Sequence, residues 1–223
     1  MERKNFEGME YLTYYPQNYI EGNKYPVVLF LHGAGTRGDD IAILQQNPFL
    51  RDAIDRYADY GFITIAPHCK HGTWFDYFER LRRLTHTIAH AAFTDPARLY
   101  LVGNSMGGYG TWQLAMSMPD YFAAILPICG GGMAWNAGQL VNVPVWAFHG
   151  AKDNVVSPDE SRRMVAAVKA CGGEARLTLY PEAAHDAWTP TYANGEVFAW
   201  LFEKRNRNAI PVQDPYSADA IYG

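Results

Sequence analysis

With 223 residues, the chain is long enough to bury one core without disulfides or metals, so we expect a single domain. Apolar residues make up 48% and charged residues 19%, and the net charge of −4 offers no basic surface for nucleic acid. Cys69, Cys129 and Cys171 are too scattered for a disulfide framework, and no apolar stretch suits a membrane span or a secretory signal. The composition therefore predicts a cytoplasmic protein with no nucleic-acid partner and no membrane span.

Strand patterns and helix patterns alternate along the chain. The apolar, β-branched run at residues 25–33 is typical of a central strand covered on both faces. In chain order we predict strand 25–33, helix 48–60, strand 61–67, helix 75–93, strand 97–103, helix 107–118, strand 122–130, strand 143–150, helix 158–171, strand 175–181 and helix 196–205. This alternation predicts an α/β fold with a mostly parallel sheet and helices on both faces.

The domain is expected to span residues 1–205. Residues 206–223 contain two prolines and little periodicity, so we expect this tail to wrap the surface or to be loose.

Residues with catalytic chemistry follow three of the predicted strands. Ser105, Asp153 and His185 each come shortly after a strand ends. In open parallel sheets, ligands bind outside the carboxyl ends of the strands. The sequence therefore predicts a functional site at that edge.

Residues 103–107 read Gly-Asn-Ser-Met-Gly, which is the G-x-S-x-G pattern of a nucleophile elbow. The pattern lies between a predicted strand and a predicted helix, as the elbow requires. The flanking glycines suit a tight turn where any Cβ would clash, and the helix N-terminus favours negative charge beside Ser105. We predict Ser105 as a nucleophile; the alternative is an ordinary glycine-rich turn.

A serine hydroxyl needs a base, and the base needs an acid that orients it. Asp153 in "AKDNVV" and His185 in "EAAHDAW" supply these groups, and the chain order Ser, Asp, His is that of the α/β-hydrolase fold. An Asx-turn is the alternative interpretation of Asp153. Asp159 and Glu160 are rival acids, but they begin the next helix, where capping and the helix dipole explain them.

No metal site and no cofactor are predicted. His86 and His90 lie four residues apart on one helix but have no evident third ligand. His68 and His71 flank Cys69, yet no second pair of ligands accompanies them.

Acyl transfer also needs donors for the developing oxyanion. The backbone N–H of Met106 is one candidate, and Ala34, in the loop "HGAGTRG" after the first central strand, is the other. That loop loosely resembles a phosphate cradle, but the acidic pair Asp39 and Asp40 would repel phosphate. His32, in this loop, and His149 each precede a glycine at the end of a strand, and both are interpreted as structural.

The segments "FLHGAGTRGDD", "VGNSMGGYGTW", "FHGAKDNVV" and "AHDAWTPTY" together resemble compact, lidless α/β-hydrolases. The resemblance is to the phospholipase/carboxylesterase and feruloyl-esterase-like group, whose members are sometimes labelled predicted peptidases, and it covers nearly the whole chain. It implies Ser105, Asp153 and His185 as a triad, with Ala34 and Met106 as oxyanion donors. It also implies a serine carboxylesterase that cleaves short-chain or sugar-linked esters of the acetyl or feruloyl type.

Substrate specificity is less well determined by the sequence. No insertion after the elbow is long enough for a cap, so we expect an open, shallow site. Trp74 and Trp188 are our best candidates to line a substrate pocket, ahead of Met133 and Trp135. A serine peptidase and a non-catalytic binding module of the same fold remain alternatives, and the sequence leaves open whether the chain forms a homo-oligomer.

Overall fold

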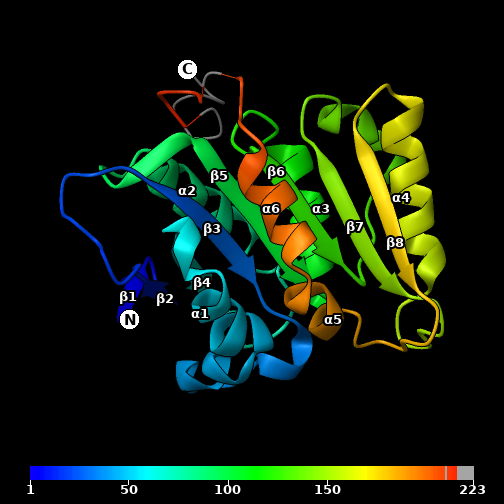
Figure 1. Ribbon diagram of the computed structural model, residues 1–223, viewed down its shortest axis with the longest axis horizontal. Helices are drawn as coiled ribbons and strands as arrows, with labels where there is room; N and C mark the ends of the chain where they lie inside the picture. Colours follow the sequence, from blue (N-terminus) through cyan, green and yellow to red (C-terminus); the bar gives the residue numbers. More distant parts are fainter. Residues whose placement is uncertain (209, 215–223) are drawn as a thin grey trace.

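The computed structural model describes residues 1–208 and 210–214. Eight strands form one sheet in the order β1-β2-β4-β3-β5-β6-β7-β8 (Figure 1). The strands are β1 Glu2–Phe6, β2 Met9–Tyr14, β3 Tyr25–Leu31, β4 Ile63–Pro67, β5 Thr94–Asn104, β6 Ala124–Ile128, β7 Val145–Gly150 and β8 Ala175–Tyr180. Strand β3 pairs in parallel with β4 and with β5, and β5, β6, β7 and β8 continue the sheet as parallel neighbours. The pairs β1 with β2 and β2 with β4 are antiparallel. The predicted α/β fold with a mostly parallel sheet is confirmed.

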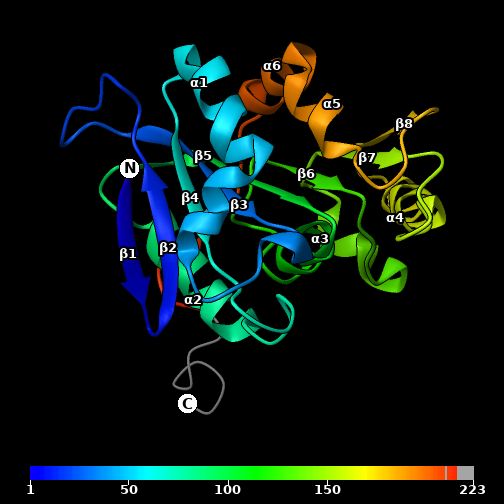
Figure 2. The ribbon, with the colours of Figure 1, turned by 90° about the horizontal axis from the view of Figure 1, so that it is seen from below.

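Helices cover both faces of this sheet, and Figure 2 shows the three layers. The helices are α1 Ile54–Arg56, α2 Phe78–Ala89, α3 Met106–Ser117, α4 Pro158–Ala170, α5 Trp188–Ala193 and α6 Gly195–Glu203. One core lies between the sheet and α2, α3 and α4; the other lies beneath α5, α6 and the segment around α1. Burial of both faces explains why the central strands are apolar along their whole length.

Several boundaries differ from the expected ones for local reasons. The predicted helix 75–93 begins only at Phe78, because the Asp76 carboxylate accepts bonds from the backbone N–H of Thr73 (2.7 Å) and from its hydroxyl (2.8 Å) and so closes a turn. The predicted helix 48–60 is a π-helical turn at Phe49–Ala53, then α1, then a 3₁₀ turn at Ala58–Tyr60. The hairpin of β1 and β2 was not predicted.

Part of the C-terminal tail packs on the body of the protein. The backbone N–H of Asn206 donates to the carbonyl of Ala97 (2.9 Å), its side-chain amide donates to that of Asp120 (2.6 Å), and Ile210 packs on one core. Residues 209 and 215–223, the rest of the predicted tail, lie outside the described residues. Within residues 1–208 and 210–214, no helix has both the length and the apolar character needed to cross a membrane.

Strands β3, β5, β7 and β8 end at one edge of the sheet, which is the lower edge in Figure 1. The loops that follow these strands carry Ala34, Ser105, Asp153 and His185. The fold therefore brings together four segments that are far apart in the sequence.

Candidate active site

The turn between β5 and α3 holds Ser105 in a strained conformation, with φ 55° and ψ −119°. Such a backbone costs about 1–3 kcal/mol and persists only where the surroundings enforce it. The Ser105 N–H donates to the carbonyl of Ile128 at 2.8 Å. A Cβ on Gly107 would lie 1.9 Å from the carbonyl oxygen of Leu31, and one on Gly103 would lie 2.4 Å from the Gly107 carbonyl oxygen. Glycine at both positions is thus a steric requirement of the turn.

Ser105, His185 and Asp153 form a continuous hydrogen-bonded chain. The His185 Nε2 lies 2.9 Å from the Ser105 Oγ, and the His185 Nδ1 lies 2.7 Å from Oδ2 of Asp153. The Asp153 carboxylate is fully buried, whereas the His185 side chain is 21% exposed. The structure thus brings together the three residues predicted from the sequence, in the arrangement that activates a serine hydroxyl.

The Asp153 carboxylate is held in an ionised state by the donors around it. Its Oδ1 accepts from the backbone N–H groups of Val155 and Val156, both at 2.9 Å. Burial by itself would raise the pKa of Asp153, but the hydrogen bonds from His185 and from these two amides outweigh it, so the pKa is lowered. Asp153 can therefore stabilise positive charge on His185.

Backbone contacts connect the loop that carries Asp153 to the loop that carries His185. The Lys152 N–H donates to the carbonyl of Ala183 at 3.0 Å. A Cβ on Gly150 would lie only 1.8 Å from the carbonyl oxygen of Ala184. The distance between the acid and the base is thus set by the close approach of two loops.

Ala34 and Met106 are each the first residue of a helix, at Ala34–Thr36 and at α3. The N–H at that position has no acceptor inside its own helix and is free for another acceptor. Ala34 lines the same cavity as Ser105. This placement is compatible with the predicted oxyanion hole, which stays a prediction.

A largely apolar cavity of about 500 Å³ opens beside Ser105. Its lining comes from four loops of the sheet edge and consists of Gly33, Ala34, Gly35, Thr36, Gln46, Asn47, Pro48, Asn104, Ser105, Val155, His185 and Trp188. The indole of Trp188 meets the His185 ring edge-on, with 5.2 Å between the ring centroids. Trp188 therefore lines the cavity beside Ser105, and its predicted role in substrate binding stays a prediction.

The expectation for Trp74 was wrong. Its side chain is fully buried, its indole N–H donates to the carbonyl of His32 at 3.0 Å, and it is not among the residues that line the cavity. A Cβ on Gly110 of α3 would lie 3.1 Å from the Trp74 ring. Trp74 thus packs between α3 and the end of β3, a role that its position after a strand did not reveal.

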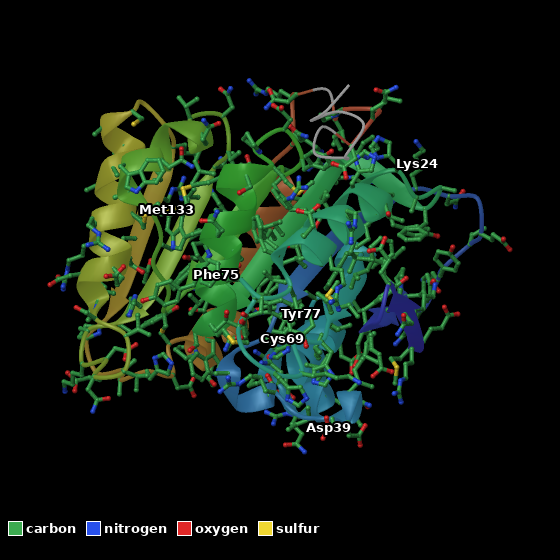
Figure 3. All side chains as sticks on the ribbon, turned by 180° about the vertical axis from the view of Figure 1, so that it is seen from behind. Lys24, Asp39, Cys69, Phe75, Tyr77 and Met133 are labelled. Atoms are coloured by element: carbon green, nitrogen blue, oxygen red, sulfur yellow. The ribbon has the colours of Figure 1, made fainter. Side chains whose placement is uncertain are left out.

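A second hollow, of about 480 Å³, lies along the exposed side of α3. It is apolar and is lined by Phe75, Tyr109, Gln113, Gly131, Gly132, Met133 and Glu160. The backbone N–H of Tyr109 bonds to the carbonyl of Ser105, so the hollow begins within one helical turn of the elbow. Figure 3 shows Phe75 lying over α3, with Met133 further toward α4.

Among the described residues, one cluster has atoms close enough to hold a metal ion: Cys129, Asp153 and His185, within 4.8 Å of one another. Its members already bond to each other, and the Cys129 thiol donates to the His185 carbonyl at 3.1 Å. Burial raises the pKa of Cys129 to about 12, so the thiol keeps its proton and is a poor metal ligand. The cluster fits a hydrogen-bonded catalytic centre better than a metal centre.

Sequence reasoning missed two groups of residues near the site. Gln46, Asn47 and Pro48 line the cavity although they belong to a segment with no catalytic motif. His149 was interpreted as structural, yet its Nε2 lies 3.2 Å from Oδ2 of Asp153. Its position four residues before the predicted acid, at the end of a strand, was the available signal.

Comparison with known proteins identifies the class. The profile of the Dienelactone hydrolase family matches residues 21–197, and the chain belongs to this family of the α/β-hydrolase superfamily. An Escherichia coli protein named "Putative carboxymethylenebutenolidase" is 26% identical over 165 residues, which are 61% of each chain.

Solved structures share the fold. A thermostable esterase superposes with a TM-score of 0.75 and 30% identity over 88% of this chain and 59% of its own. Est1E from Butyrivibrio proteoclasticus superposes with a TM-score of 0.70 and 15% identity over 91% of this chain and 99% of its own, which shows the fold alone. The chain spans only part of several relatives, and in a secreted protein of Arthroderma benhamiae, 24% identical over 225 residues, it covers 23%.

Proposed function

We propose that this protein is a serine hydrolase that cleaves uncharged carboxylic esters through an acyl-enzyme. The observation that carries the proposal is the unbroken chain from the Ser105 Oγ through His185 to the buried carboxylate of Asp153. Membership of a hydrolase family and the fold match to an esterase support the same reaction class.

In the proposed mechanism, His185 takes the proton of Ser105 as the hydroxyl attacks the ester carbonyl carbon. The backbone N–H groups of Ala34 and Met106 hold the developing oxyanion. His185 then gives its proton to the leaving alcohol oxygen, and later it activates the water that releases the acid. Asp153 keeps the imidazole oriented and stabilises its positive charge in both steps.

The cavity favours neutral substrates. Of the residues that the structure describes, those lining the cavity include no lysine and no arginine, so a substrate carboxylate would find no cation among them. Its volume of about 500 Å³ suits a small ester, and Trp188 offers an aromatic face. We therefore favour short acyl groups and aromatic acyl groups of the feruloyl type, on small or sugar alcohols, over lactones that carry a carboxylate.

The test compares rates on p-nitrophenyl acetate, butyrate and octanoate, on methyl ferulate, and on a carboxylate-bearing lactone. We expect hydrolysis of the neutral esters, with rates that fall as the acyl chain lengthens. Ser105→Ala should lose at least about 10⁴-fold in kcat, because no other group supplies the nucleophile. Ser117→Ala, at the far end of α3, is the matched control and should stay within about twofold. Equal rates for the Ser105 variant and the parent protein would contradict the proposal.

A cytoplasmic location was predicted from the scattered cysteines and from the absence of a secretory signal pattern, and the three free thiols of the structure are compatible with a reducing compartment. We keep it as part of this proposal. A tagged full-length chain followed by cell fractionation tests it.

A further inference from the structure

His149 stands at the end of β7 and contacts the acid of the proposed triad directly. Its Nε2 lies 3.2 Å from Oδ2 of Asp153 and 3.0 Å from the carbonyl oxygen of Val156. The side chains of His149 and Asp153 are both fully buried. This contact is separate from the hydrogen-bonded chain of Ser105, His185 and Asp153.

The partners of His149 decide which nitrogen carries its proton. Nε2 faces two oxygens that can only accept, so a proton there is attracted by both. Nδ1 lies 2.7 Å from the hydroxyl of Ser161, whose single proton has two acceptors within reach, this nitrogen and the carbonyl oxygen of Gly130 at 3.1 Å. The two acceptors at Nε2 favour the tautomer with the proton there, where it bonds to the Val156 carbonyl and lies beside the Asp153 carboxylate.

Burial, the largest influence, lowers the pKa of His149, although its bonds to Val156 and Asp153 act in the opposite direction. The imidazole is therefore neutral at physiological pH. A neutral donor stabilises the negative charge on Asp153 without adding a positive charge that would compete with protonated His185.

With this contact, each oxygen of the Asp153 carboxylate has two nitrogen neighbours. Oδ1 accepts from the amides of Val155 and Val156, and Oδ2 bonds to His185 Nδ1 and lies 3.2 Å from His149 Nε2. A carboxylate that is fixed at both oxygens cannot rotate away from the base. The fourth nitrogen belongs to β7 itself and not to the loop that follows it.

We propose that His149 is a positioning residue: its Nε2–H donor fixes the Asp153 carboxylate toward His185 and limits how strongly His185 binds its proton. This inference rests on the proposed function. If the donor is removed, the full charge of Oδ2 faces His185, and protonated His185 becomes more stable. The free base that accepts the Ser105 proton is then formed only at higher pH.

Other titratable groups near this pair come from several elements. Cys129, after β6, keeps its proton because burial raises its pKa to about 12. Tyr109 on α3 has a raised pKa, mainly through burial and then through the charge of Glu160, so it too stays neutral. Glu160 on α4 is neutralised by Arg163 at 2.8 Å. Since burial keeps Cys129 and Tyr109 uncharged near neutrality, a shift in the pH profile reports on the triad.

Two replacements separate the donor from the space that His149 fills. His149→Gln keeps an N–H group near the place of Nε2, whereas His149→Met keeps volume but has no donor. We expect His149→Met to lower kcat/KM about 10- to 100-fold, mainly in kcat, and to move the acid limb of the pH profile up by about half a unit. His149→Gln should restore most of both properties.

Thr85→Val is the control for a lost buried hydrogen bond, because the Thr85 hydroxyl bonds to the Leu81 carbonyl inside α2, far from the site. It should lower thermal stability and leave the pH profile unchanged. An unshifted profile in His149→Met, or equal impairment in the Gln and Met variants, would overturn the proposal.

A second measurement does not require catalysis. The proton on His185 Nδ1, in its 2.7 Å bond to Asp153, should give a far-downfield NMR signal. The chemical shift of this signal should change in His149→Met and return in His149→Gln. If the parent protein hydrolyses no ester, the proposed function fails, while this measurement still tests the role of His149.

Discussion

The elbow that carries Ser105 and the pair of loops that carry Asp153 and His185 are built in different ways. At the elbow, the turn is forced by steric contacts inside the core, as the short distances from Gly103 to Gly107 and from Gly107 to Leu31 of β3 show. In the paired loops, position depends on hydrogen bonds between residues about 30 apart, such as Lys152 with Ala183. The nucleophile is therefore placed by close packing of the turn against the sheet, and its partners are placed by hydrogen bonds between two loops.

This difference has a consequence for stability and activity. A strained turn inside the core is part of the fold, so damage to it should unfold the protein. Loops that meet at the surface can shift while the sheet persists, so damage there should separate the catalytic groups first.

Among the variants that test this comparison, the largest effect on activity is expected in the paired loops. Asp153→Asn should lower kcat about 10⁴-fold at neutral pH, because the amide neither stabilises positive His185 nor keeps its tautomer. Steady-state kinetics on p-nitrophenyl acetate measures this effect. Asp159→Asn, which alters an exposed carboxylate paired with Arg162, should stay within about twofold. A large loss in the Asp159 variant with none in the Asp153 variant would assign the acid differently.

Two glycine replacements test the comparison directly. Gly107→Ala forces a Cβ to 1.9 Å from the Leu31 carbonyl oxygen between β3 and α3, and should lower the free energy of unfolding by more than about 3 kcal/mol. Gly150→Ala forces a similar clash at 1.8 Å from Ala184, but the loop can move, so we expect a smaller loss of stability with about 100-fold lower activity. Urea unfolding and kinetics on the same samples distinguish the two outcomes.

Gly195→Ala is the control, because a Cβ on Gly195 meets nothing within 4 Å. Its effect on stability should stay below about 1 kcal/mol. If Gly107→Ala and Gly150→Ala lose stability equally, the two regions are not built differently.

The pH dependence of stability should reveal the buried His32 at the end of β3. Burial lowers its pKa from 6.5 to about 4 in the folded protein. Between these values the unfolded chain binds a proton that the folded protein does not, so stability falls as the pH falls through this window. The loss should reach about 3 kcal/mol near pH 4.

His32→Gln should remove this part of the slope, measured as urea unfolding at several pH values from 7 to 4. His71→Gln, at a side chain that is 72% exposed, should leave the slope unchanged. If the parent protein and both variants showed the same dependence of stability on pH, His32 would have the same pKa in the folded and the unfolded protein.

Local patterns in the sequence determined much of the site. The strand, the two glycines and the helix around Ser105 are adjacent in the chain, and glycine was the only residue that the contacts at positions 103 and 107 allow. Asp153 and His185 could be predicted because parallel strands deliver their following loops to one edge. Both inferences depend only on short-range geometry and on strand order.

Only the tertiary structure decided the rest. Strand β1 is mostly polar, and the backbone groups of β2 find partners in β4, which no local pattern reveals. Trp74 is buried because Gly110 of α3, which has no side chain, leaves room for the indole ring. His149 lies beside Asp153 because the loop after β7 folds back over the end of the strand. The physical reason is the same in each case. The burial and the hydrogen bonds of a residue depend on partner residues that are distant in the sequence, so local patterns do not identify them.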